Sequence, residues 1–300
     1  MRPLQRWAVA SAALFLVSAN ILGQGAPSKP AEKGAAVATA PKWIGPDGQP
    51  LPWKSDAEVE EFLKKASIGK TKGTSKGITR PSKMELSRDG VRANAIFHGI
   101  DEEKRFIQLK GGERIMDFRD SYMFQIAAYK LSRMVGLENV PPAVKRTFAG
   151  TTGSVTFWVE GMITDEMRRA ENREPTGEDE VRWGRQMAIM LVWDALIFNF
   201  DRNQGNILLD NNWNVWLIDH TRSFRRSDDI TKQLKSIGSC ERRLFESIRA
   251  LNRQDVEQQV KGYLRPGEIE NLFKRREQLV AHLEKLARER GEDKVFFTYP

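Results

Sequence analysis

Two acids and an amide are spaced at short intervals in the stretch between residues 199 and 224. Asp201 is followed five residues later by Asn206, and Asp219 comes thirteen residues after Asn206. Between Asn206 and Asp219, two short apolar runs flank Asp210-Asn211-Asn212, a sequence typical of a tight turn. We therefore predict two strands joined by this turn, which would return Asn206 and Asp219 to the same end of a hairpin.

This order of groups suits phosphoryl transfer, which needs positioning and charge neutralisation more than covalent help from the protein. In the protein-kinase pattern the first acid, here Asp201, orients the attacking hydroxyl, and the amide and the second acid hold metal ions. Mg²⁺ prefers oxygen ligands and takes only one or two of them from a protein. Asn206 and Asp219 are therefore predicted to bind Mg²⁺ or Mn²⁺ beside ATP. The simpler interpretation is a surface hairpin in which Asp201 and Asn206 only cap turns.

The composition indicates a globular protein with a sizeable core, since 40% of the 300 residues are hydrophobic and 29% are charged. A net charge of +8 favours anionic partners such as nucleotide phosphates or acidic peptides. The basic residues are mixed with acidic ones and no nucleic-acid-binding motif occurs, so nucleic acid is not an expected partner. Cys240 is the only cysteine, which excludes an intramolecular disulfide and a cysteine zinc site. The hydrolase motifs G-x-S-x-G and H-E-x-x-H do not occur either.

The N-terminus has the pattern of a secretory signal peptide over residues 1–23. Arg2 and Arg6 precede a mostly apolar segment from Trp7 to Leu22, and small residues near positions 19 and 25 suit cleavage. An uncleaved anchor and a cytoplasmic amphipathic start are the alternatives. We expect a secreted, periplasmic or secretory-pathway lumenal protein with no transmembrane span in its mature chain. Residues 24–54 are predicted to be a flexible linker.

The rest of the chain divides into a strand-rich part and a helical part. Residues 55–78 are predicted to hold a short helix, Asp56–Ala66 with Ser55 as its cap, and a mobile segment. Strands are predicted over 83–87, 91–98, 105–110, 144–148 and 154–159, with a helix over 119–134. From residue 162 onward, helices are predicted over 178–198, 229–236, 239–251, 255–263 and 265–290. The helix over 178–198 is apolar, but charged residues interrupt it too often for a membrane span. The charged side chains of the last helix are expected to form a solvated face.

Several short motifs resemble those of secretory-pathway kinases of the Golgi casein kinase and four-jointed type, and more loosely HipA-like and phosphatidylinositol kinases. The matching pieces are Asp201-Arg202, Ile218-Asp219, Ile126-Ala127-Ala128-Tyr129, Leu131 and Val140-Pro141-Pro142. The resemblance covers roughly residues 80–225. It implies an α+β, bilobal protein-kinase-like fold, with a strand-rich N-lobe and one long helix over 79–161 and a helical C-lobe over 162–300. It also implies ATP- and metal-dependent transfer to a hydroxyl on a protein, glycan or small molecule.

Two positions depart from the pattern of the kinases that the chain resembles. His98 stands where those kinases have the lysine that contacts the nucleotide phosphates, and Gln125 stands where they have the glutamate that holds this lysine. A neutral histidine is a poor substitute for a fixed cation, and a glutamine forms no ion pair. One explanation is that Lys110 is the true phosphate lysine, with Lys104 and Arg105 near it in the sequence as further candidate cations. The other is that the chain is a catalytically impaired pseudokinase, which acts as a nucleotide-binding or regulatory module.

The same resemblance places adenine against the backbone that follows the last strand, at Val159 and Glu160. The neighbouring Trp158 would then lie beside the adenine, and the alternative is that Trp158 is simply a residue of the hydrophobic core. Arg202 is expected to brace its loop by pairing with a carboxylate, and His220 is expected to pack. Thr221 and Arg222 are given structural roles in preference to phosphate contacts. An unrelated secreted helical protein with an accidental motif is the third interpretation of the chain.

Overall fold

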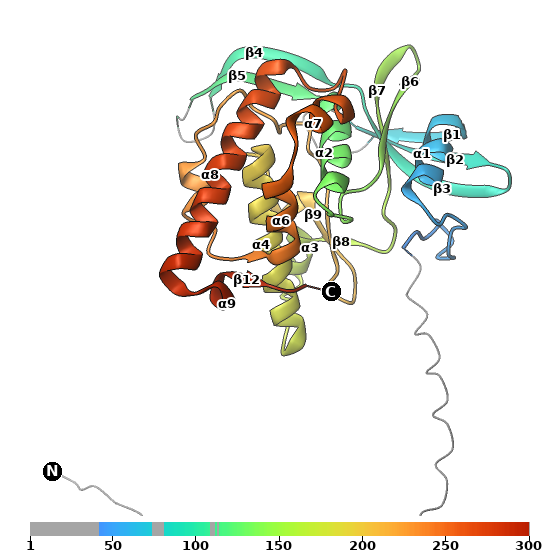
Figure 1. The fold of residues 1–300 in the computed structure, drawn as a ribbon. Helices are drawn as coiled ribbons and strands as arrows, with labels where there is room; N and C mark the ends of the chain where they lie inside the picture. Colours follow the sequence, from blue (N-terminus) through green and yellow to red (C-terminus); the bar gives the residue numbers. More distant parts are fainter. Residues whose placement is uncertain (1–41, 74–80, 109–111, 113, 300) are drawn as a thin grey trace, which may run out of the picture. The chain divides into compact units, whose positions relative to one another are not determined.

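The computed structural model describes residues 42–73, 81–108, 112 and 114–299. The predicted signal peptide over 1–23, most of the predicted linker, and Lys110 lie outside these residues. The described chain mixes strands and helices, with most strands before residue 165 and most helices after it (Figure 1).

Five antiparallel strands form the main sheet in the order β1-β2-β3-β7-β6. They are β1 (Ser67–Gly73), β2 (Ser82–Arg88), β3 (Val91–His98), β6 (Ala143–Phe148) and β7 (Thr151–Phe157). Helix α1 (Asp56–Lys65) packs against this sheet and begins with the predicted cap at Ser55, which forms a capping box with Glu58. A separate hairpin joins β4 (Asp101–Gln108) to β5 (Arg114–Ser121). The strands predicted over 83–87 and 91–98 are confirmed as β2 and β3, which pair with each other, whereas the strand predicted over 105–110 corresponds to β4 in the separate hairpin.

Two segments predicted to be mobile are part of the folded structure. The part of the predicted linker after residue 41 carries Trp43, which is only 2% exposed and packs against Phe157 and Trp216. The segment after α1 forms β1 instead of a mobile loop. For residues 42–54 and 67–73 the structure thus differs from the expectation, and the remainder of both segments lies outside the described residues. The physical reason is that β1 is an edge strand without a buried side chain, so its sequence shows no alternation, and isolated tryptophans in a Gly- and Pro-rich stretch give no periodicity.

Helix α2 (Tyr122–Met134) begins three residues later than predicted. Residues 119–121 belong to β5, and the Ser121 hydroxyl accepts a hydrogen bond from the backbone N–H of Met123, which caps the helix. Nine side chains of α2 are buried. They contact both the sheet, at β6 and β7, and the helices of the second half. The helix therefore links the two parts of the chain.

The second half is built around α4, as predicted. Its elements are β8 (Ile163–Thr164), α3 (Asp165–Ala170), α4 (Glu178–Ile197), a 3-10 turn (Gln204–Asn206), β9 (Ile207–Leu209), β10 (Val215–Leu217), α5 (Thr231–Leu234), β11 (Cys240–Glu241), α6 (Arg242–Ala250), α7 (Arg253–Gln259), α8 (Pro266–Arg290), α9 (Glu292–Val295) and β12 (Phe296–Phe297). The sequence did not predict β8, α3, β11, α9 or β12, because elements of two to six residues are too short to show a period. None of the described helices is long and apolar enough to cross a membrane.

Buried apolar side chains form two clusters. One lies under the sheet and includes residues of α1, β2, β3 and β7, and the other joins α2, α4 and the C-terminal helices. Helix α8 is less solvated than expected, because Arg275 is fully buried and donates to the carbonyl oxygens of Leu196, Arg225 and Ser227. This arginine therefore ties α8 to the end of α4 and to the chain that follows Asp219.

Candidate nucleotide and catalytic site

The loop that carries Asp201 is held at its base by Arg202. The Nε and Nη2 atoms of Arg202 donate to the two carboxylate oxygens of Asp194 at 2.9 and 3.0 Å. Its Nη1 atom donates to the carbonyl oxygens of Asn206 and Ile218, each at 2.7 Å. The pair is almost fully buried, with side-chain exposures of 7% for Arg202 and 10% for Asp194. The prediction that Arg202 braces the loop by pairing with a carboxylate is confirmed, although the sequence did not identify Asp194 as the partner.

The predicted hairpin brings Asn206 and Asp219 together. Strands β9 and β10 are antiparallel, and the backbone N–H of Ile218 donates to the carbonyl of Asn206 at 3.2 Å. Asp219 has a φ of +52°, in the left-handed region that few residues other than glycine occupy. The Thr221 hydroxyl donates to Oδ1 of Asp219 at 2.9 Å and steadies this conformation. Such backbone strain is often found at functional sites.

A cavity of about 560 Å³ gathers five of the eight predicted site residues. Its walls include His98 on β3, Gln125 on α2, Val159 after β7, Asn206 and Asp219. Asp201 does not line this cavity, Lys110 lies outside the described residues, and Glu160 turns to Asn94, whose Nδ2 donates to it at 2.5 Å. The volume falls within the usual range for small-molecule and cofactor pockets.

Three basic side chains among the described residues line the cavity: His98, Lys72 on β1 and Lys83 on β2, and of these His98 stands at the position expected for the phosphate lysine. Burial lowers the pKa of His98, while the nearby carboxylates of Asp219 and Asp120 oppose this shift only in part. The histidine is therefore neutral at neutral pH. Its Nδ1 atom, the Thr156 hydroxyl and the Gln125 Nε2 are all buried without a hydrogen-bond partner. Orphaned buried polar atoms are rare and point to a bound water or ligand.

Gln125 has a role that the sequence did not suggest. Its Oε1 atom accepts a hydrogen bond of 2.8 Å from the backbone N–H of His220, the residue after Asp219. The backbone N–H of Ser121, at the start of the same helix, donates to the carbonyl of Thr221 at 2.9 Å. Helix α2 thus holds the Asp219 loop directly, without a lysine between them. His220 itself is fully buried against Trp193, as expected.

The segment after β7 forms the outer wall of the cavity. Trp158 lines it and is only partly buried, with the Lys83 ammonium 3.9 Å from the centre of its ring, so it is not a core residue. The backbone N–H of Trp158 donates to the carbonyl of Asn94 at 3.0 Å and is therefore occupied. A base in this cavity would have to use the backbone of Val159 or of the residues that follow it. Lys83 also lines the cavity, and no sequence signal marked it.

The donor set suits a metal ion. Asn206 donates its Nδ2 to the carbonyl of Asp201 at 3.1 Å, which leaves its amide oxygen as the free end. Asp219 supplies a carboxylate beside it. Among the described residues no group of three or more His, Cys, Asp or Glu side chains could hold a metal by itself. A carboxylate and an amide that share Mg²⁺ with phosphate oxygens and water match the usual coordination of this ion.

Asp201 does not line the cavity, and its carboxylate pairs with Arg222. Its Oδ2 atom accepts a hydrogen bond of 3.0 Å from Nη1 of Arg222, whose Nε atom donates to Asp120 at 2.7 Å. Burial raises the pKa of Asp201, Arg222 counteracts this rise, and the charge of Asp219 adds to it. The structural role predicted for Arg222 agrees with these contacts.

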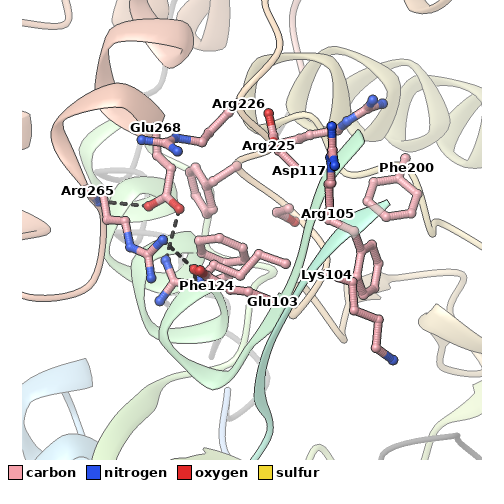
Figure 2. Close-up of a pocket in the computed structure, with 14 residues that line it drawn as sticks. Glu103, Lys104, Arg105, Asp117, Phe124, Phe200, Arg225, Arg226, Arg265 and Glu268 are labelled. Carbon is pink, nitrogen blue, oxygen red and sulfur yellow. Dashed lines mark hydrogen bonds and ion pairs between the residues drawn. The ribbon is translucent and has the colours of Figure 1, made fainter. Parts of the chain in front are cut away.

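A second, smaller pocket of about 260 Å³ is lined in part by Phe124 and Phe200 (Figure 2). Lys104 and Arg105 line this pocket and do not line the cavity with His98, so they supply no cation there. Figure 2 shows Arg225 and Asp117 on one side of the pocket and Arg265, Arg226 and Glu268 on the other. Its floor includes the buried ion pair of Arg119 and Glu268 at 2.9 Å.

No protein-family model matches the chain, and no curated protein matches it either. Solved structures do share its fold. Hydra Fam20 with sugar is 14% identical, with a TM-score of 0.59 over 82% of this chain and 94% of that one. The Golgi casein kinase is 13% identical, with a TM-score of 0.57 over 82% of this chain and 80% of its own, and the values are the same for its structure with Mn/ADP bound. These similarities show a kinase-like fold and confirm the resemblance to the Golgi casein kinase type.

Replacement of Arg202 by glutamine should lower the free energy of unfolding by about 3–5 kcal/mol, because it leaves the buried charge of Asp194 without a partner. Urea unfolding would measure this change. The control is Lys274→Gln, which removes an exposed ion pair with Glu270 on α8 and should cost less than about 1 kcal/mol. Equal losses in the two variants would contradict the role assigned to Arg202.

Proposed function

We propose that the protein binds ATP with Mg²⁺ or Mn²⁺ and transfers the terminal phosphoryl group to a hydroxyl on a protein, glycan or small molecule. The observation that carries the proposal is the cavity that brings Asn206, Asp219, His98, Gln125 and Val159 together. These residues come from distant parts of the sequence, and an accidental motif would not be expected to converge on one pocket. The kinase-like fold of the chain supports the same function.

In this proposal the base of ATP lies against Trp158 and Val159, and the phosphates extend toward Asp219. Asn206 and Asp219 would hold the metal, which neutralises the phosphate charge. Asp201 would orient the attacking hydroxyl and accept its proton. We also propose the two-lobed arrangement, with an N-lobe over 79–161 and a C-lobe over 162–300. The two clusters of buried apolar residues support this division.

The second candidate is a pseudokinase that binds nucleotide without efficient transfer. The specific observation in its favour is the buried, neutral His98, which lines the cavity together with Gln125 at the positions expected for the lysine and the glutamate. A neutral side chain stabilises phosphate charge less than a fixed cation does. The two candidates therefore agree on nucleotide binding and differ on turnover.

We further propose that residues 1–23 direct export, so that the mature protein acts in the periplasm, outside the cell or in the lumen of the secretory pathway. The support is the pattern of the segment itself, with arginines before an apolar stretch and small residues after it. Membership of the kinase-like fold does not require export, so this proposal stands independently of the reaction.

ATP with Mg²⁺ or Mn²⁺ should raise the melting temperature of the protein, because a ligand that binds only the folded state stabilises it by about 2.7 kcal/mol at a hundredfold excess over Kd. A thermal melt with and without nucleotide would show this. Asp219→Ala should abolish the metal-dependent part of the shift.

The control for that experiment is Asp179→Ala, which removes an exposed acid at the start of α4, outside the cavity. It should leave the shift unchanged. Absence of a shift at millimolar ATP in the wild-type protein would end both nucleotide-dependent candidates and leave only a kinase-shaped scaffold.

The double variant His98→Lys/Gln125→Glu separates the two candidates. A glutamate at position 125 keeps the acceptor for the N–H of His220, and Asp219 lies near enough to pair with the new lysine. If the wild type is a pseudokinase, the double variant should hydrolyse ATP about 10-fold faster or more, since a preorganised charge can contribute about 100-fold to such a rate. If the wild type is an active kinase, Asp201→Asn should abolish its turnover, and the double variant should gain little.

Export can be tested by the mass of the protein recovered from a host with a secretory pathway. Cleavage should remove about 19–25 residues, as expected for a signal peptide of ordinary length. A variant in which Leu14 and Leu16 are replaced by arginine should stay inside the cell at full mass. Recovery of the uncleaved wild-type chain from the cytoplasm would contradict export.

A further inference from the structure

Arg222 joins the proposed catalytic acid to a buried carboxylate on another element. Its Nη1 atom donates to Oδ2 of Asp201 at 3.0 Å and its Nε atom donates to Oδ2 of Asp120, at the end of β5, at 2.7 Å. We infer that Arg222 is a positioning residue, anchored by Asp120, that fixes the carboxylate of Asp201 for the attack of the acceptor hydroxyl. The inference rests on the proposed phosphoryl transfer and deepens it.

The anchor is rigid at its buried end. The side chain of Asp120 is only 3% exposed, that of Arg222 is 22% exposed, and that of Asp201 is 36% exposed. The guanidinium group also lies over the ring of Phe118, 5.8 Å from its centre. A planar guanidinium with several donors in fixed directions can hold two carboxylates at set angles, which an ammonium group cannot do. The contact therefore transmits the position of β5 to the exposed acid.

The backbone around Arg222 is fixed by the same element. Ser121 follows Asp120, and its N–H donates to the carbonyl of Thr221, which precedes Arg222, at 2.9 Å. Residues 120–121 and 221–222 are thus joined by one backbone hydrogen bond and one ion pair. Arg222 cannot swing toward solvent without breaking both contacts with Asp120 and Asp201.

The chemistry of the step explains why a fixed carboxylate is useful. The acceptor oxygen forms a bond to the terminal phosphorus, the bond from this phosphorus to the bridging oxygen breaks, and ADP leaves. The hydroxyl proton passes to Asp201. Because Arg222 occupies Oδ2, Oδ1 is the oxygen that we assign to the hydroxyl. An ion pair makes a carboxylate less basic, but the loose transition state of phosphoryl transfer depends more on orientation than on base strength.

Two other roles for Arg222 fit the structure less well. A direct phosphate contact would compete with the two carboxylates of Asp120 and Asp201, to which Nε and Nη1 of Arg222 already donate. A purely structural ion pair would need only the buried Asp120. The second contact adds little stability, because an ion pair with a partly exposed acid is screened by solvent.

Hydrolysis of ATP, with water as the acceptor, provides the test, because it needs no identified substrate. Arg222→Gln should lower kcat by about 100-fold, since a displacement of about 1 Å can have such an effect, and should leave KM nearly unchanged. Arg222→Lys should recover only part of the rate. Guanidinium added to Arg222→Ala, below the concentrations that unfold the protein, should raise kcat again.

Asp120→Asn should reduce kcat as Arg222→Gln does, and the double variant should lose no more than the worse single variant, because the two residues act as one unit. The matched control is Arg133→Gln, an arginine of similar exposure paired with Asp56 far from the cavity, which should keep wild-type kcat in the folded protein. Thermal melts identify variants that fail to fold. If Arg222→Gln does not fold, Arg222→Lys and Asp120→Asn still test the contact between Arg222 and Asp120, each by changing one of the two partners.

Wild-type kcat in Arg222→Gln, or a rise in KM with unchanged kcat, would overturn the inference while Asp201→Asn still abolishes turnover. The inference would also be overturned if Arg222→Lys were fully active while added guanidinium failed to raise the kcat of Arg222→Ala. Only the positive charge, and not the planar guanidinium group, would then matter. If Asp201→Asn hydrolyses ATP as fast as the wild type, the proposed reaction itself fails and the inference falls with it.

Discussion

The buried pair of Arg202 and Asp194 is the interaction on which the site depends. Two carboxylate contacts fix the guanidinium to helix α4, and its remaining donor group holds two carbonyls at the open end of the β9–β10 hairpin, those of Asn206 and Ile218. Arg202 also lies 3.0 Å from Nε2 of His220, and burial together with this cation lowers the pKa of that histidine well below its usual range. One side chain thereby sets the positions of the catalytic loop, the hairpin and the Asp219 loop.

Charge is distributed unevenly around this framework. Among the residues described, His98, Gln125 and Thr156 bring neutral polar groups to the cavity, whereas the charges of Asp120, Asp201 and Asp219 all act on Arg222. Gln125 shows how an active-site helix can stay attached without a lysine–glutamate pair, because its amide oxygen binds the backbone beside Asp219. In the sequence, Gln125 suggests that an ion pair has been lost, whereas in the folded protein its side chain makes a structural hydrogen bond. Helix α2 therefore stays attached to the Asp219 loop with a histidine at position 98.

Strong local patterns predicted the larger elements correctly. The turn residues after Leu209 predicted the hairpin, and the long apolar stretch after residue 178 predicted α4. The errors have a common cause, since they fall where tertiary contacts override weak local signals. Trp43 packs although the residues around it resemble a linker, and β1 pairs with β2 although hardly any of its side chains are buried. Helix α2 starts later than predicted because residues 119–121 pair with β4 as part of strand β5, and Ser121 then caps the helix.

The sequence by itself determined the hairpin, the spacing of Asp201, Asn206 and Asp219, and the kinase-like resemblance, because these depend on turn chemistry and on residues close together in the chain. Only the tertiary structure decided the partners of those residues. Asp194 and Asp120 are ordinary acids in the sequence, and only folding brings them to Arg202 and Arg222. Contacts between residues such as Asp120 and Arg222, about a hundred positions apart, leave no periodicity or local motif, so they become visible only once the chain is folded.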